Sequence, residues 1–186
     1  ARGEARLAMT RFNHGQVDVA TERMGRSFEV LVRDEPDADV AMLASQLARF
    51  RYLLDDLDGA LEPLEFALET AEALRLPGVI SDALNTKGLI VSQRGHKEEG
   101  LALIRHALGL ALEHDLGEAT LRAYFNLSFL MACRDRIEEA ERLDEEGLAL
   151  ARRRGNRQWE ESFIGHLRTN HYFIGDWDYV RPSLDE

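Results

Sequence analysis

Residues 79–117 read VISDALNTKGLIVSQRGHKEEGLALIRHALGLALEHDLG and contain two helical patterns separated by one glycine. The first runs from Val79 to Arg94, and its apolar residues have the spacing of one helix face: Ile80, Ala83, Leu84, Ile90 and Val91. The second runs from Lys97 to His114, with apolar residues at Leu101, Ile104, Ala107, Leu108 and Ala111. Because Gly95 ends the first helix and Gly117 follows the second, the stretch predicts a helical hairpin.

This hairpin belongs to a series with a period of 40 residues. Small or turn-forming residues recur at that interval, at Gly15, Asp55, Gly95, Asp135 and Gly175. A second series lies five residues after these positions and consists of Ala20, Ala60, Gly100, Ala140 and the larger Val180. The sequence therefore predicts an all-α array of helical hairpins in a single domain over residues 1–186, with units at about 1–36, 37–77, 78–117, 118–156 and 157–186. We expect Ala60, Gly100 and Ala140 to be buried where two helices cross.

Composition limits the classes of function. Hydrophobic residues make up 45% of the chain and charged residues 31%, as in a folded protein. Cys133 is the sole cysteine, which excludes an internal disulfide and favours the cytoplasm. A net charge of −11 argues against direct nucleic-acid binding, which depends on Lys and Arg neutralising phosphates. The longest uncharged stretch, Tyr124 to Cys133, is too short to span a membrane.

Both ends indicate a segment of a longer protein. The chain begins at Ala1, inside what reads as a first helix, and closes at Glu186, only six residues after Val180. The earlier units continue for another helix beyond that position. We therefore expect the fifth hairpin to be truncated.

Several motifs resemble the tetratricopeptide repeat, a family of paired helices. Tyr124-Phe125-Asn126-Leu127-Ser128 is similar to its Trp-x-Asn-Leu-Gly element, Leu84 and Gly88 occupy the same places, and Gly175-Asp176-Trp177 resembles its turn. The resemblance implies a right-handed superhelical solenoid of stacked antiparallel helix pairs, with about five hairpins. The long period is similar to the repeats of large bacterial transcription activators and of ATPase-linked and adenylate-cyclase-linked regulators. In such proteins the repeats form a sensor arm.

The resemblance also assigns residues to a groove lined by first helices. Family positions transfer to Met9, Phe12, Ser45, Arg49, Tyr52, Asn85, Leu89, Ser92, Phe125, Asn126, Phe129, His166, Thr169 and Tyr172. The aromatic members either complete helix packing or anchor a partner. Arg49 either grips a carboxylate or phosphate or pairs with a nearby acid such as Asp56, and Asn126 either lines the groove or repeats a structural asparagine.

No pattern indicates catalysis. His166 and His171 point about 140° apart on a helix, and zinc-protease, cysteine-pair, nucleophile-elbow and phosphate-loop motifs are missing from the sequence. We therefore predict a non-catalytic module without metal or cofactor.

Two functions remain open. The first is a sensor or interaction arm of a bacterial signalling or transcription regulator, binding a protein, a peptide or a small-molecule effector. The second is a structural module that pairs with its own copies. Pairing would use the C-terminal unit, where a missing second helix leaves an apolar face: Trp159, Phe163, Ile164, Leu167, Tyr172, Phe173 and Ile174.

Overall fold

The computed structural model describes residues 17–33 and 35–180, and every regular element in those ranges is a helix. The described chain divides into two compact units that meet at His114 and Asp115. The predicted turn at Gly15 and the groove residues Met9 and Phe12 lie outside the described residues.

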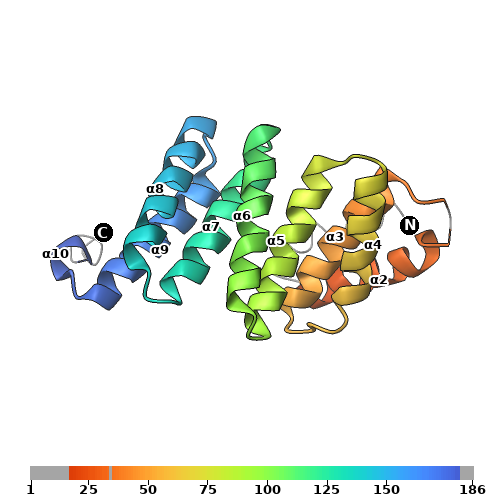
Figure 1. Ribbon diagram of the computed structural model, residues 1–186, viewed down its shortest axis with the longest axis horizontal. Coiled ribbons are helices and arrows are strands. Elements are labelled where there is room, and N and C mark those ends of the chain that lie inside the picture. Colours follow the sequence, from red (N-terminus) through yellow and green to blue (C-terminus); the bar gives the residue numbers. More distant parts are fainter. Residues whose placement is uncertain (1–16, 34, 181–186) are drawn as a thin grey trace. The chain divides into compact units, whose positions relative to one another are not determined.

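The described part of the unit that ends at His114 contains five helices. They are α2 (Val17–Leu31), α3 (Ala38–Leu53), α4 (Leu61–Ala73), α5 (Pro77–Gln93) and α6 (Lys97–Glu113). Figure 1 shows α3 with α4, and α5 with α6, as neighbouring helices joined by short turns. The predicted all-α hairpin architecture is confirmed here, with boundaries within a few residues of those expected.

The unit that begins at Asp115 repeats the same design. It contains α7 (Gly117–Ala132), α8 (Ile137–Arg154), α9 (Arg157–Ile174) and the short α10 (Trp177–Val180). Pro77 and Gly117, at which two of the predicted units end, are instead the first residues of α5 and α7. Proline is well suited to that place, because the first turn of a helix does not use its N–H group.

The turns follow one backbone rule. Seven described residues have positive φ, and they fall every 20 residues, at Asp55, Arg75, Gly95, Asp115, Asp135, Gly155 and Gly175. Around Gly155, the N–H of Gly155 donates to Arg152 O at 3.1 Å and the N–H of Asn156 donates to Ala151 O at 3.0 Å, which is the Schellman pair of bonds. The predicted 40-residue series marks every second one of these helix ends.

The second predicted series consists of buried small residues. Ala20, Ala60 and Ala140 are fully buried, and Gly100 is buried too. A Cβ placed on Gly100 would lie 2.5 Å from Gly88 O and 2.8 Å from Ser92 Cβ, so α5 and α6 approach closely at this point. A further buried small series, which the sequence analysis missed, runs through Ser27, Ala67, Ala107 and Gly147.

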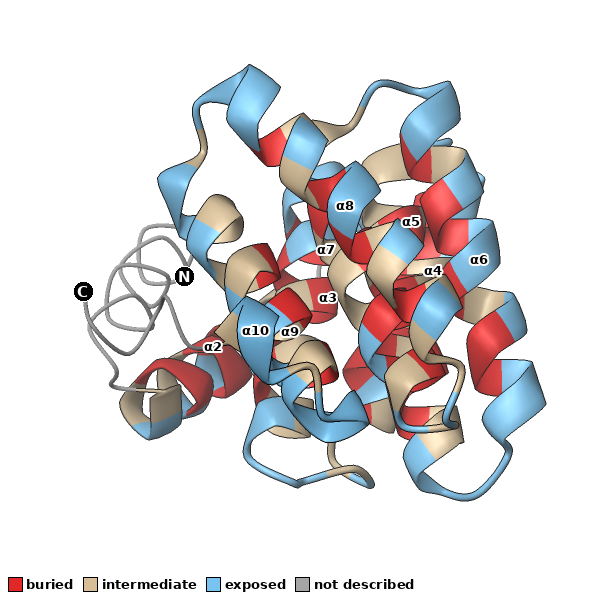
Figure 2. Cartoon of the chain, turned by 90° about the vertical axis from the view of Figure 1, so that its left-hand side faces the viewer, coloured by how far each residue is buried: buried red, intermediate tan, exposed pale blue. Residues whose placement is uncertain are grey.

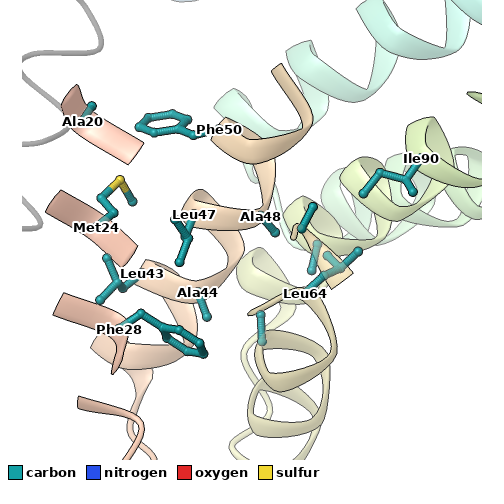
Figure 3. Close-up of a cluster of buried hydrophobic side chains, with 13 residues drawn as sticks. Ala20, Met24, Phe28, Leu43, Ala44, Leu47, Ala48, Phe50, Leu64 and Ile90 are labelled. Carbon is teal, nitrogen blue, oxygen red and sulfur yellow. The ribbon is translucent and has the colours of Figure 1, made fainter. Parts of the chain in front are cut away.

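The helices differ in how much of their circumference is buried: α6 is buried along one side, whereas α3 and α7 bury residues on most sides. Figure 2 shows red and blue stretches alternating along α6, whose buried residues are spaced three and four apart. In the first unit these sides form one apolar cluster, in which Met24, Leu47, Leu64 and Ile90 come from four different helices (Figure 3). This apolar burial stabilises the stacked hairpins.

Candidate functional site

A pocket opens in the second unit beside α7 and α9. Its volume is about 550 Å³, enough for a small molecule or a peptide side chain. Its lining residues come from α7, α9, the Asp135 turn and the start of α8: Phe129, Ala132, Cys133, Asp135, Ile137, His166, Thr169, Asn170 and Phe173.

Helix α9 supplies one side of this pocket. His166, Thr169, Asn170 and Phe173 stand at positions i, i+3, i+4 and i+7, which share one helix face. Asn156 caps the start of α9 by accepting from Trp159 N at 3.3 Å, and both residues donate to Glu118 of α7, at 2.7 and 2.9 Å. These contacts fix α9 against α7 near the helix starts.

The end of α7 supplies the opposite side. Phe129 lies on its last turns and is 47% exposed, although it is large and apolar. Helix α7 ends at Ala132, and Asp135 then turns the chain with a φ of 58°. The turn thereby brings a carboxylate and an exposed thiol, Cys133, to the rim.

A buried carboxylate lies behind the α9 wall. Asp144 of α8 has no exposed surface, and it occupies the place, at 40-residue spacing, that Met24, Leu64 and Ile104 fill in the other hairpins. Its oxygens lie 3.3 Å from His166 Nδ1 and 3.3 Å from Asn170 Nδ2. A buried charge without partners is strongly destabilising, so these two side chains are what make Asp144 tolerable in the core.

Aromatic packing holds the His166 ring. The Phe125 ring stacks on it with a centroid distance of 3.7 Å and an interplanar angle of 18°. Phe125 also meets Trp159 at 5.6 Å and Phe163 at 5.9 Å, both edge-on. Phe163 is buried against Gly147, whose missing side chain leaves room for the ring. The imidazole is therefore oriented from one side by Phe125 and from another by Asp144.

The structure brings some of the predicted groove residues together. In the second unit, Phe125, Phe129 and His166 meet, with Phe129 and His166 centroids 6.4 Å apart. Phe125 packs against rings of α9 and is not in the pocket lining, whereas Phe129 lines the pocket. Tyr172 is exposed and contacts Phe173 and Trp177 instead. Asn126 is half-buried on α7, outside the pocket lining.

The predicted groove residues of the first unit lie on α3 and α5. Asn85 is buried, whereas Arg49 and Tyr52 are half-buried. Burial and the nearby charge of Asp55 raise the pKa of the Tyr52 phenol. Asp56, suggested as a partner for Arg49, lies 4.0 Å from Arg51 Nε. A groove that continues through both units stays a prediction.

Four residues of this site were not predicted from the sequence, three in the pocket lining and one, Asp144, buried behind it. Asp144, Asn170, Cys133 and Phe173 were not assigned to the groove, although Thr169 and His166 were. Asp144 could have been found by aligning the hairpins at 40-residue spacing, because an acid then falls in a column of aliphatic residues.

Two features are absent from residues 17–33 and 35–180. Over these residues no group of three or more His, Cys, Asp or Glu side chains is placed to hold a metal ion. Within the same part of the chain, no helix has the length and apolar character needed to cross a membrane.

Comparisons with known proteins identify the fold. No protein-family model matches the chain, and no curated protein matches it. Among solved structures, similar chains include a Signal Transduction ATPase with Numerous Domains protein from Pyrococcus horikoshii, which has a tetratricopeptide repeat sensor. That match has a TM-score of 0.72 and 15% identity, and it covers 95% of this chain and 27% of the other.

Two further matches cover most of both chains. BtubC from P. vanneervenii has a TM-score of 0.69 and 18% identity, over 96% of this chain and 74% of its own. A thermophilic tetratricopeptide repeat protein from Thermus thermophilus has a TM-score of 0.67 and 18% identity, over 97% of this chain and 86% of its own. At these identities the likeness establishes the fold. The chain is an all-α array of tetratricopeptide-like hairpins.

Proposed function

We propose that this chain is a non-catalytic binding module and that the pocket between α7 and α9 is its binding site. The observation that carries the proposal is the pocket itself, in which exposed Phe129 of α7 and Phe173 of α9 accompany a short row of polar groups on α9. A few polar groups among apolar walls are typical of sites that orient a ligand. The occupant is a small-molecule effector or a side chain of a peptide or protein partner.

The wider role we propose is the sensor or interaction arm of a cytoplasmic bacterial signalling or transcription regulator. The similar Pyrococcus horikoshii protein is a signal-transduction ATPase with a tetratricopeptide repeat sensor, and this chain covers 27% of it. Such arms are built from repeats that provide binding surface, whereas the output activity lies elsewhere in the polypeptide.

A pocket-filling variant tests the binding function. Thr169 lines the pocket and Arg168, its exposed neighbour on α9, does not. We would screen a fragment library and a random peptide library by ligand-observed NMR against the wild type, Thr169→Trp and Arg168→Trp. Hits that bind the wild type and Arg168→Trp but not Thr169→Trp support the proposal. Hits that bind all three proteins equally, or no hits at all, refute it.

The exposed end of the second unit favours a second candidate, a module that pairs with its own copies. Five large apolar side chains there are 44% to 73% exposed: Tyr172, Phe173, Ile174, Trp177 and Tyr179. Apolar surface of this extent is typical of an interface. Sedimentation over a wide concentration range tests this idea, with Ile174→Lys as the variant expected to abolish pairing. A monomer at every concentration would contradict it.

A further inference from the structure

We infer that the pocket between α7 and α9 binds a cationic group, a primary ammonium or a guanidinium, carried on an apolar body. The inference rests on the proposed binding function and specifies its ligand class. It follows from the direction of each hydrogen bond around the pocket.

Thr169 presents an acceptor. Its hydroxyl donates to Gly165 O one turn earlier at 2.9 Å. A hydroxyl has a single hydrogen, so only the two lone pairs of the oxygen are available to a ligand. Thr169 therefore receives a hydrogen bond from a ligand and does not give one.

His166 presents an acceptor for a related reason. A carboxylate can only accept, so at the 3.3 Å contact with Asp144 Oδ1 the hydrogen lies on His166 Nδ1. In the neutral ring the other nitrogen, Nε2, then carries the lone pair. Asp144 is thus a positioning residue that sets the tautomer of His166.

Asn170 and Asp135 also offer acceptor oxygens, and Asn170 keeps one of its two Nδ2 hydrogens as a donor. Asn170 commits an Nδ2 hydrogen to Asp144 Oδ2 at 3.3 Å, and Asp135 adds a carboxylate at the rim. No Lys or Arg is among the lining residues. An anionic ligand would meet the Asp135 carboxylate and no cation in the lining, with the buried Asp144 behind the wall, whereas a cation meets acceptors and negative charge.

The apolar walls favour a cation with an apolar body. Phe129 and Phe173 are 47% and 73% exposed, which leaves ring surface for a cation to lie against. Ala132 and Ile137 line the same space, and its volume of about 550 Å³ exceeds that of an ammonium group alone. A free amine and a Lys or Arg side chain of a peptide share this chemistry.

Three probes of similar shape separate charge from size. We would titrate phenethylammonium, phenethyl alcohol and 3-phenylpropionate into the protein, following the His166 and Phe129 ring signals by NMR. Phenethylammonium should bind about 10-fold or more tightly than the alcohol, and 3-phenylpropionate should not bind. Acetyl-lysine amide and a Lys-containing pentapeptide, titrated alongside, distinguish a free amine from a peptide source.

Two variants test the assigned roles. Phe173→Ala should weaken phenethylammonium about 3- to 30-fold, whereas Tyr172→Ala, next to it but outside the lining, should bind as the wild type does. Asp144→Asn offers an amide that can donate to His166 Nδ1 and turn Nε2 into a donor. The cation preference should fall about 10-fold or more in this variant, a change in selectivity that a purely structural role would not produce.

The outcomes separate this inference from the proposed function. If 3-phenylpropionate binds as tightly as phenethylammonium and shifts the same signals, the charge preference is wrong and the binding function stands. If no probe shifts His166 or Phe129 up to millimolar concentration, both fail. If Phe173→Ala and Tyr172→Ala bind equally, the cation does not lie where we place it.

Discussion

Replacing Gly100 by alanine tests the close approach of α5 and α6. An added Cβ would lie 2.5 Å from Gly88 O and 2.8 Å from Ser92 Cβ. The nearer neighbour is a backbone atom, so no side-chain rotation relieves the contact and the helices must move apart. Overpacking of this kind costs about 1–3 kcal/mol. A glycine-to-alanine change inside a helix stabilises it by about 1 kcal/mol, so we expect a net loss of up to about 2 kcal/mol.

Gly109 provides the matched control on the same helix. It is exposed, and a Cβ there would meet nothing within 4 Å. Gly109→Ala should therefore gain about 0.5–1 kcal/mol from helix propensity alone. Urea unfolding followed by circular dichroism at 222 nm measures both, and the two variants should differ by the overpacking cost of about 1–3 kcal/mol. A Gly100→Ala protein at least as stable as Gly109→Ala would refute the close crossing.

Three other changes follow from the same structure. Arg75 has a φ of 53°, so Arg75→Gly should raise the free energy of unfolding by about 0.5–1 kcal/mol, and an unchanged urea midpoint would show that the turn is unstrained. Ala60 is fully buried, so Ala60→Phe should cost about 1–3 kcal/mol, and an unchanged melting temperature would contradict that burial. Burial, with the hydrogen bond and charge of Glu146, raises the pKa of Tyr124 from 10.0 to about 12. Because this pKa is higher in the folded state, the stability it contributes is present below pH 10 and lost between about pH 10 and pH 12, on the order of 2 kcal/mol. Tyr124→Phe should unfold with a flatter pH dependence there, and absorbance at 295 nm reads the phenol directly.

The hairpins could be predicted because their turns demand particular residues. Glycine and aspartate tolerate positive φ, so Gly95 and Asp135 mark helix ends in the sequence. The 20-residue spacing of the positive-φ residues could not be predicted from the sequence. Arg75 belongs to this series, but arginine has no preference for positive φ and so does not mark the helix end. Tertiary packing and the Schellman bonds impose the turn at Arg75 in spite of its side chain.

The candidate site could be predicted only where it follows the repeat. Phe125 and His166 occupy corresponding faces of successive first helices, so their contact was within reach of pattern reasoning. Composition conceals Asp144, because it lies in the acidic run from Glu138 to Glu146, which has the composition of a solvated helix face, and only the 40-residue alignment singles it out. Burial of one acid among many depends on the rotation of α8, which its composition does not reveal.

Asp144 also separates the two candidate functions. A scaffold that needs only to stack would be served at this position by an aliphatic residue, as Met24, Leu64 and Ile104 serve the other hairpins. A buried carboxylate gives up that packing, and replacing such a group by an apolar residue is often neutral or stabilising. Places where a sequence breaks its own local rule tend to be functional sites, and this one lies directly behind the pocket wall formed by His166 and Asn170. The buried acid at position 144, where the other hairpins have an aliphatic residue, therefore favours ligand binding over self-association as the function of the second unit.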